Sequence, residues 1–357
     1  MNFKNKRRWK VIRDYCIGWI FAFIFLSIVR GVGTIEVSSV QFKLIETLLV
    51  SFIFGVIFGS ISGYVQILTE ERIYKRISIQ KLLIIRFLYA ILFLITIIIV
   101  SYAMVRIFFE ETKGLIAFAF EPGSFAIYFY IISVDFFMTV LRQVNLLLGD
   151  NNLLKILRGK FYTPREEERI FMFLDLQSST MHAEKLGHIK YSMMIQDCFN
   201  DLGVVVENEA EIYQYAGDEV ILTWKLKEGI RNENCINAYF SFKQKLIKKQ
   251  EYYLQKYNCL PFFKAGLNAG IVTVTEVGKY KKEIAYHGDT INTAARIQSK
   301  CNEFNQELLI SENLKIKLES KKFKFNKLGS IQLRGKEKKE SIFSVIENST
   351  HIESNKN

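Results

Sequence analysis

Two aspartates, each placed at the end of a short apolar run, are the residues of this chain best suited to metal chemistry. Asp175 follows the apolar residues 171–174, and Asp218 lies in a Gly-Asp-Glu turn between two further β-like runs. A strand end is a fixed point at the rim of a sheet, so the two carboxylates can converge. Carboxylates bind Mg²⁺, and a pair of such ions can activate a hydroxyl and stabilise a leaving oxygen in phosphoryl chemistry.

A second polar pair lies further along the chain. Asn292 and Arg296 are four residues apart in a segment with helical periodicity, so they are expected on one face of a helix. There Arg296 could neutralise phosphate while Asn292 orients a sugar. Together with the two carboxylates, this pattern is typical of an enzyme that uses nucleotides.

The elements that must position these groups alternate after residue 170. Asp218 is expected at the turn of a β-hairpin formed by 211–215 and 220–224. A β-α-β-β-α-β order with appended elements is that of a ferredoxin-like α+β sandwich. The remaining predicted strands are 171–176, 204–206, 262–267, 270–275, 308–310, 328–333 and 342–345, and the predicted helices are 183–202, 233–257 and 289–301.

The first 148 residues have a different composition. Half of the whole chain is hydrophobic and its mean hydropathy is positive, and the excess lies almost wholly before residue 150. A transmembrane helix needs about 20 apolar residues. Four long apolar stretches lie in this part of the chain, and they predict an all-α bundle of about four helices in a lipid bilayer. A signal peptide would need a small-residue cleavage site, which is absent before the second span, so an uncleaved anchor is favoured. The predicted spans are 15–29, 44–68, 82–105 and 125–148.

Charge then sets the orientation of the spans. Lys and Arg are concentrated before the first span, between the second and third, and after the fourth, which predicts a multi-pass protein of the cell membrane with both termini in the cytoplasm. The same clusters account for much of the net charge of +12, so no nucleic-acid partner is expected.

The five cysteines have no CxxC spacing, which argues against a zinc site. Asp135 falls within the fourth span and is expected to face protein.

Composition also predicts the domain boundaries. Residues 1–148 form the transmembrane domain, and residues 149–168 form a polar cytoplasmic linker that contains Gly159 and Pro164. Residues 169–347 form the catalytic domain. The last ten positions, 348–357, are polar and are expected to be a disordered tail.

The ordered motifs of residues 169–345 resemble the catalytic domain of class III nucleotidyl cyclases, the family of adenylate and guanylate cyclases. The two aspartate segments are similar to the family's metal-binding strand and hairpin. Residues 264–270 resemble its basic-x-Gly-x-x-x-Gly strand pair, 288–296 its transition-state helix, and 333–336 its late phosphate-binding turn. A single Gly-Asp pair would not identify a family, but here five motifs occur in the family's order.

This resemblance implies a role for each matching position. Asp175 and Asp218 would hold two Mg²⁺ or Mn²⁺ ions per active site, with the backbone carbonyl of Leu176 as a further ligand. Arg296 would stabilise the transition-state phosphate, and Asn292 would orient the ribose. The implied contact with the triphosphate is Lys336, with Lys338 and Lys339 as alternatives in register. In this family the metal aspartates and the Asn/Arg pair meet across a subunit interface, which implies a homodimer with composite active sites.

The positions that select the base depart from the family pattern. Gln214 stands four residues before Asp218, where adenylate cyclases usually have Lys and guanylate cyclases Glu. Ala285 stands seven residues before Asn292, where the family has Asp or Thr for adenine and Cys or a similar residue for guanine. A glutamine amide can both donate and accept, whereas Ala285 offers no polar group.

The expected reaction is conversion of a nucleoside triphosphate to a 3′,5′-cyclic nucleotide and pyrophosphate. ATP is the expected substrate because ATP-using members dominate the membrane-bound bacterial forms, while GTP or a pyrimidine triphosphate stays open. The alternative is a membrane receptor whose inactive cyclase-like domain only binds nucleotide. Such degenerate domains typically lose a metal aspartate or the arginine, and this chain retains Asp175, Asp218 and Arg296.

Overall fold

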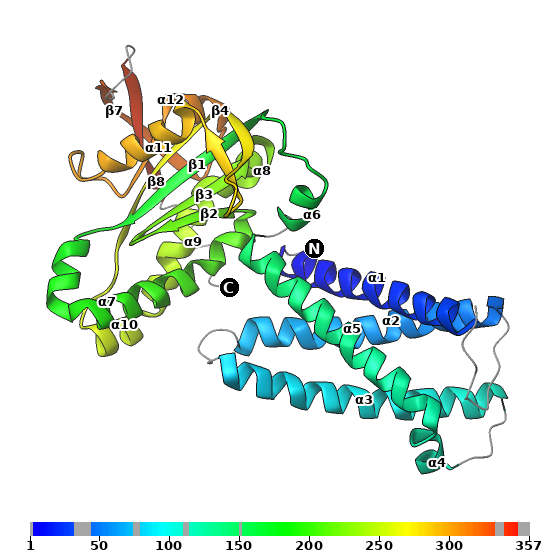
Figure 1. Cartoon of the computed structure of the whole chain (residues 1–357). Helices are drawn as coiled ribbons and strands as arrows, with labels where there is room; N and C mark the ends of the chain where they lie inside the picture. The colour runs from blue at the N-terminus through cyan, green and yellow to red at the C-terminus, as the bar shows by residue number, and fades with distance from the viewer. Residues whose placement is uncertain are drawn as a thin grey trace. The chain divides into compact units, whose positions relative to one another are not determined.

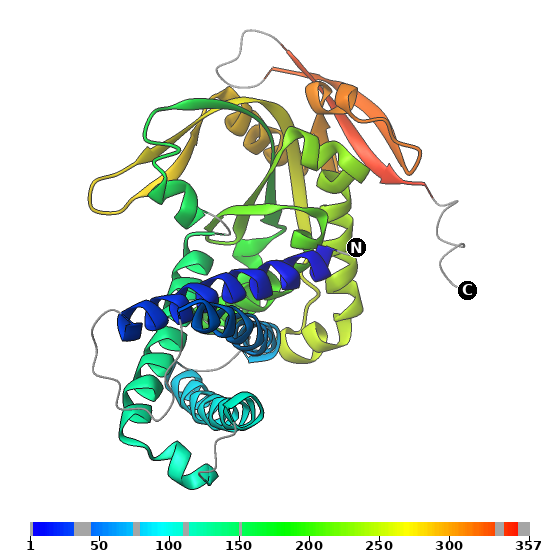
Figure 2. The ribbon, with the colours of Figure 1, turned by 90° about the vertical axis from the view of Figure 1, so that its right-hand side faces the viewer.

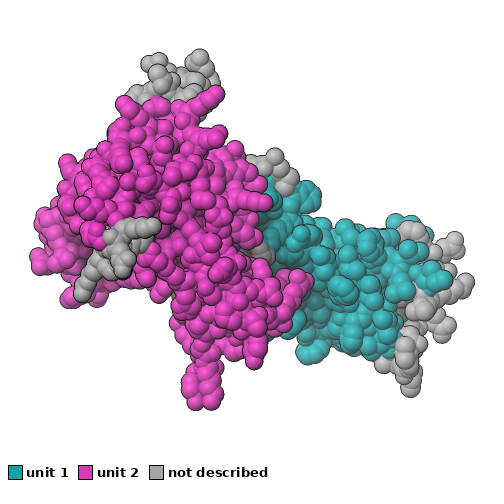
Figure 3. Space-filling view, turned by 90° about the horizontal axis from the view of Figure 1, so that it is seen from above, with its two compact units in different colours: residues 1–147 teal, residues 148–357 magenta. Residues whose placement is uncertain are grey.

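The computed structural model describes residues 3–31, 44–73, 79–109, 114–149, 152–332 and 339–348. The chain divides into two compact units, residues 1–147 and 148–357 (Figures 1 and 3). The first unit is helical. Its elements are α1 (Phe3–Gly31), α2 (Leu44–Leu68), the π-helical turn η1 (Thr69–Ile73), α3 (Ile79–Phe109), α4 (Leu115–Ala119) and α5 (Pro122–Leu147).

Among the described residues of this unit, four helices are long and apolar enough to cross a membrane, which confirms the predicted all-α N-terminal part. The qualifying stretches are Asn5–Val29, Leu48–Glu71, Leu88–Ile107 and Gly123–Leu147. Helices α1 and α2 approach closely along glycines of α2. A Cβ at Gly59 would lie 2.3 Å from the Cα of Cys16, and one at Gly55 would lie 2.6 Å from the Cα of Ile20. Such close backbone approach is a common means of helix association in lipid.

Polar side chains also connect helices within this unit. The Ser62 hydroxyl of α2 donates a hydrogen bond to the Asp135 carboxylate of α5 at 2.6 Å. Arg142 of α5 donates to Glu70 of η1 at 2.8 Å, and both side chains are largely buried. Asp135 therefore faces another helix of the bundle, as its sequence position predicted.

The described residues of the second unit form a mixed eight-stranded sheet with strand order β2-β3-β1-β4-β6-β8-β7, and β5 pairs with β4 off this path. Strand β1 lies antiparallel between β3 and β4, whereas β4 and β6 are parallel. The strands are β1 (Arg165–Leu176), β2 (Glu211–Ala216), β3 (Glu219–Lys225), β4 (Phe263–Val277), β5 (Glu283–His287), β6 (Leu308–Ser311), β7 (Phe323–Ile331) and β8 (Glu340–Glu347).

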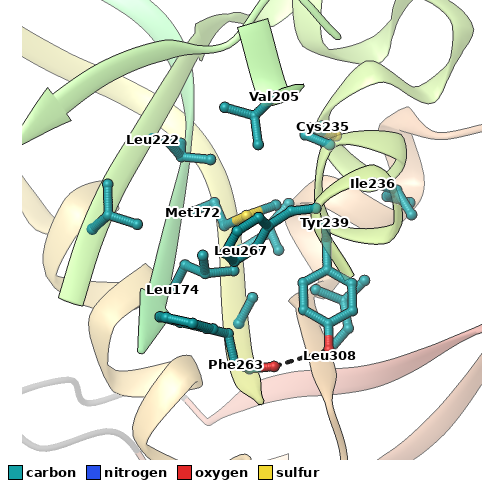
Figure 4. Packing of buried hydrophobic residues seen from close by; sticks show 14 of the residues in the cluster. Met172, Leu174, Val205, Leu222, Cys235, Ile236, Tyr239, Phe263, Leu267 and Leu308 are labelled. Carbon is teal, nitrogen blue, oxygen red and sulfur yellow. Dashed lines mark hydrogen bonds between the residues drawn. The ribbon is translucent and has the colours of Figure 1, made fainter. Parts of the chain in front are cut away.

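Both faces of the central strands are covered. Alternate residues of β1 enter a large core that includes α7 (Ser179–Leu202), α9 (Asn234–Lys248) and α10 (Gln250–Tyr257). Figures 1 and 2 show these helices beside the sheet. Met172 and Leu174 lie in this core beside Tyr239, whose hydroxyl donates to the Phe263 carbonyl at 3.0 Å (Figure 4). Phe171 and Phe173 enter a second core that includes α11 (Asp289–Ser299).

Several elements differ from the prediction. Residues 204–206 lie in a 3₁₀ helix, η2 (Gly203–Asn208), because this short apolar run continues from the end of α7. The two strands expected at 262–267 and 270–275 are one continuous strand, β4, while the helix expected at 233–257 is divided into α9 and α10 near Lys249. Strand β5, which carries Ala285, was not predicted. Helices α8 (Leu226–Ile230) and α12 (Glu312–Lys317) are short additions.

The segment before β1 is part of the second unit. It contains the short helix α6 (Asn152–Leu157), and the Phe161 side chain is buried in the same core as Phe171. The backbone N–H of Glu276 donates to the Phe161 carbonyl at 2.9 Å. Strand β1 begins at Arg165, four residues before the catalytic domain was expected to start.

Helix α11 approaches β4 so closely that Gly266 has no room for a side chain. A Cβ there would lie 2.2 Å from the backbone nitrogen of Gln298. We expect Gly266→Ala to displace α11, lower stability by about 1–3 kcal/mol and reduce activity. Gly203→Ala is the matched control, because its Cβ would meet no atom within 4 Å. Thermal unfolding of both variants tests this, and an unaltered Gly266→Ala protein would contradict the close packing of α11 on β4.

Candidate active site

Asp175 lies near the C-terminal end of β1, directly after the buried run of residues 169–174. Its neighbours Leu174 and Leu176 are each 1% exposed, whereas Asp175 is half-buried. In the sheet Asp175 pairs with Glu219 of β3 on one side and with Lys264 of β4 on the other. The flanking leucines therefore hold the carboxylate at the rim of the sheet.

Asp218 is brought next to this rim by the β2–β3 hairpin. It follows Gly217, whose φ of 64° is in the left-handed region that favours glycine, and it precedes Glu219, the pairing partner of Asp175. Burial, and then the charge of Asp218, raise the pKa of Asp175. The structure thus brings the two predicted metal ligands together closely enough for one charge to affect the other.

A third carboxylate, Glu219, belongs to the same cluster, although the sequence analysis gave it no role. Burial, followed by the charges of Asp175 and Asp218, raises its pKa to about 7. Its place directly after Asp218 was the available signal. In the part of the chain that the structure describes, no three His, Cys, Asp or Glu side chains are arranged to hold a metal ion by themselves. The clustered carboxylates still fit divalent cations, which prefer oxygen ligands and would relieve the repulsion.

Two further side chains support the carboxylates. Gln298 of α11 lies with its amide nitrogen 3.4 Å from an Asp175 carboxylate oxygen, and this contact lowers the Asp175 pKa. The backbone N–H of Leu176 acts in the same direction. Tyr191 of α7 lies beside Asp218, and burial followed by that charge raises the Tyr191 pKa to about 12. Neither Gln298 nor Tyr191 carried a sequence signal, because both contacts are tertiary.

Helix α11 presents the predicted Asn/Arg pair. Asn292 is exposed, and the Arg296 side chain is 33% exposed, with its guanidinium 3.9 Å from an Asp289 carboxylate oxygen. The start of the helix is anchored to the sheet at Thr290. Its hydroxyl donates to the Ile271 carbonyl at 2.8 Å, and its carbonyl accepts from Asn268 at 3.0 Å. Strand β4 therefore fixes where the helix begins.

The two base positions lie on different strands. Gln214 is an exposed residue of β2, and Ala285 of β5 pairs with Thr275 of β4. Their chain neighbours meet directly, because the rings of Tyr213 and Tyr286 are 4.9 Å apart between centroids. Lys336 and Lys338 lie outside the described residues, while Lys339 is described and exposed.

Comparison with known proteins identifies the family and the fold of this domain. The family model of the adenylate and guanylate cyclase catalytic domain matches residues 161–347, just over half of the chain. The chain is 30% identical over 205 residues to Adenylate cyclase 2 of Rhizobium meliloti (strain 1021), a match that covers 57% of this chain and 56% of that protein. The chain thus spans little more than half the length of this curated relative.

Two solved structures of a bacterial light-regulated adenylyl cyclase share the fold. Their TM-scores are 0.52 and 0.54, each at 18% identity, and the matches cover 59% and 64% of this chain and 62% and 67% of those chains. The chain belongs to the adenylate and guanylate cyclase catalytic domain family. The predicted α+β ferredoxin-like cyclase fold is confirmed.

The Glu219 pKa gives a pH prediction. In the unfolded chain, Glu219 loses its proton near its usual pKa of 4.5. In the folded protein its pKa is raised to about 7, so the side chain stays protonated over this interval. Its stabilising contribution is therefore complete below pH 4.5 and is lost as the pH rises towards 7. With a chelator present, we expect the stability advantage of wild type over Glu219→Gln to shrink across this window. Thermal unfolding of both proteins measures it, added Mg²⁺ should oppose the loss, and parallel pH curves would contradict it.

Proposed function

We propose that this chain is a membrane-bound nucleotidyl cyclase, which converts a nucleoside triphosphate, in the first place ATP, to a 3′,5′-cyclic nucleotide and pyrophosphate. The observation that carries this proposal is the convergence of Asp175 and Asp218 at the end of the central strands of a cyclase domain. The same domain retains Asn292 and Arg296 on α11.

The roles of the residues follow from their chemistry. Asp175, Asp218 and the Leu176 carbonyl would hold two Mg²⁺ or Mn²⁺ ions, which supply Lewis-acid activation of the 3′-hydroxyl when bound. Arg296 neutralises negative charge on the reacting phosphate. Asn292, one turn earlier on the same helix face, holds the ribose in place. Lys336, in the predicted phosphate-binding turn, contacts the triphosphate.

We further propose a homodimer in which each active site combines two subunits. Asp175 and Asp218 of one subunit would face Asn292 and Arg296 of the other, as the resemblance of the motifs to class III cyclases implies. The exposed position of Asn292 supports this arrangement, because its side chain is accessible to a partner. Dimerisation through the spans would raise the effective concentration of the two half-sites.

The substrate proposal rests on the base positions and on the relative. The exposed Gln214 amide can form hydrogen bonds with adenine. The small Ala285 side chain has no polar group that would select against adenine. The Rhizobium meliloti relative carries the name Adenylate cyclase 2. Guanine remains the competing base, because a glutamine amide also presents the reverse pattern of donor and acceptor.

The membrane arrangement completes the proposal. Residues 1–148 would span the cell membrane four times, with both termini in the cytoplasm, and residues 149–168 would couple this domain to catalytic residues 169–347, with 348–357 as a tail. The four apolar helices support the spans. The basic clusters at alternate ends support the orientation.

The direct test incubates the purified full chain with Mn²⁺ and each of the four ribonucleoside triphosphates, followed by chromatography of the products. We expect cyclic AMP as the main product. Asp175→Ala and Asp218→Ala should each lower turnover at least about a hundredfold, because charge stabilisation of the reacting groups is lost. Both variants should remain folded, since neither side chain lies in the core. A variant that keeps a substantial fraction of wild-type turnover would remove the two-metal interpretation.

Mixing variants tests the composite site. Asp175→Ala and Arg296→Ala chains should each be inactive alone, yet a mixed dimer would carry both lesions in one site and none in the other. Random pairing gives about half mixed dimers with one intact site each, so about a quarter of wild-type activity should return on co-expression. Absence of recovery from demonstrably mixed dimers would place the whole site within one chain.

A further inference from the structure

Arg169 of β1 is a buried cation that the proposed chemistry does not use. Its side chain is 2% exposed. Its guanidinium donates to the Tyr286 hydroxyl at 2.6 Å and to the Glu211 carboxylate at 2.5 Å, and it lies 4.8 Å from the centre of the Tyr286 ring. A well-packed hydrophobic residue is often as stabilising as a buried ion pair. Stability alone therefore does not account for an arginine at this position.

Arg169 also lies 3.5 Å from the Glu167 carboxylate of its own strand. Its other two partners, Tyr286 and Glu211, belong to strands that carry the proposed base-facing residues. Tyr286 follows Ala285 on β5, and Glu211 begins β2, which also contains Gln214. The Tyr213 ring of β2 meets the Tyr286 ring edge-on, with 4.9 Å between centroids. Arg169 thus joins the central strand to β2 and β5 at once, although these two strands are not paired with each other in the sheet.

An irregularity in β2 makes the position of Gln214 depend on Tyr213. Ile212 pairs with Leu222 and Gln214 pairs with Ile221, so Tyr213 is an extra residue in the strand. Cross-strand partners share a face of the sheet, and Ile221 lies in the core against which Tyr213 and Tyr286 pack. The bulge therefore places Tyr213 and Gln214 on the same face. The contacts that fix the position of Tyr213 therefore also constrain the position of the adjacent Gln214.

We propose that Arg169 is a positioning residue for the nucleotide base, which acts through Glu211 and Tyr286 to fix the places of Gln214 and Ala285. This inference rests on the proposed function, because it concerns how the same site selects its substrate. Gln214 can pair with either purine, and Ala285 contributes no polar contact. Selection between bases then depends on where the two strands lie more than on which side chains they carry.

Tyr286→Phe tests the proposal with the least disturbance, because it removes the hydroxyl that accepts from Arg169 and keeps the ring. Arg169→Lys keeps the charge and loses the planar fork of donors. Using the full chain with Mn²⁺, kcat and KM are measured for ATP and for GTP. We expect each variant to raise KM for the preferred nucleotide about tenfold and to change the ratio of kcat/KM between ATP and GTP about fivefold, with the Mn²⁺ dependence unaltered.

The matched control is Tyr253→Phe. Tyr253 is fully buried, and its hydroxyl donates to Asp201 at 2.9 Å in the layer formed by α7 and α10. This variant should lower the temperature of unfolding while KM and the nucleotide ratio stay at wild-type values. The double variant of Arg169→Lys and Tyr286→Phe should be no worse than the more impaired single variant, because both changes remove one interaction.

The outcomes separate the two proposals. If wild type cyclises a nucleotide but Tyr286→Phe and Arg169→Lys keep its KM and its nucleotide ratio, the positioning role is overturned and the proposed function stands. If stability falls in both variants without a change in KM, Arg169 is a structural residue only, and the proposal also fails. If the wild-type chain makes no cyclic nucleotide from any triphosphate, the proposed function itself fails.

Discussion

Burial of β1 on both faces is the constraint on which the candidate site depends. Ile170, Met172 and Leu174 enter one core, while Phe171 and Phe173 enter the other. A slip of one residue would exchange these two sets of side chains between cores of different shape, so the register against β3 and β4 is strongly specified. This register places Asp175 opposite Glu219 and next to the turn that carries Asp218.

The same constraint creates an electrostatic cost. Three carboxylates lie at one rim of the sheet, and burial with mutual repulsion raises the pKa of Asp175 and of Glu219. The nearest pairing partner of opposite charge, Lys264, is buried and donates to Asn302 at 2.9 Å. A site with clustered acids is suited to divalent ions, which bind best when the carboxylates are ionised.

Close packing of a helix against glycines recurs in both units. Gly266 and Gly270 of β4 allow α11 to lie on the sheet, and Gly55 and Gly59 of α2 allow α1 to lie against it. In the catalytic unit this contact determines where Asn292 and Arg296 are presented. It also explains the Gly-x-x-x-Gly spacing in β4, because both glycines face α11 and a side chain at either position would meet the helix.

The sequence by itself determined the class of fold, the four apolar helices and the chemical groups of the candidate site, because apolar periodicity and the residue types at strand ends are local properties. It did not determine β5, the continuity of β4 or the 3₁₀ form of residues 204–206, since short apolar runs do not distinguish these alternatives. The contacts of Glu219, Gln298 and Arg169 were decided only by the tertiary structure. Each depends on register or packing between segments far apart in the chain, which no local pattern encodes.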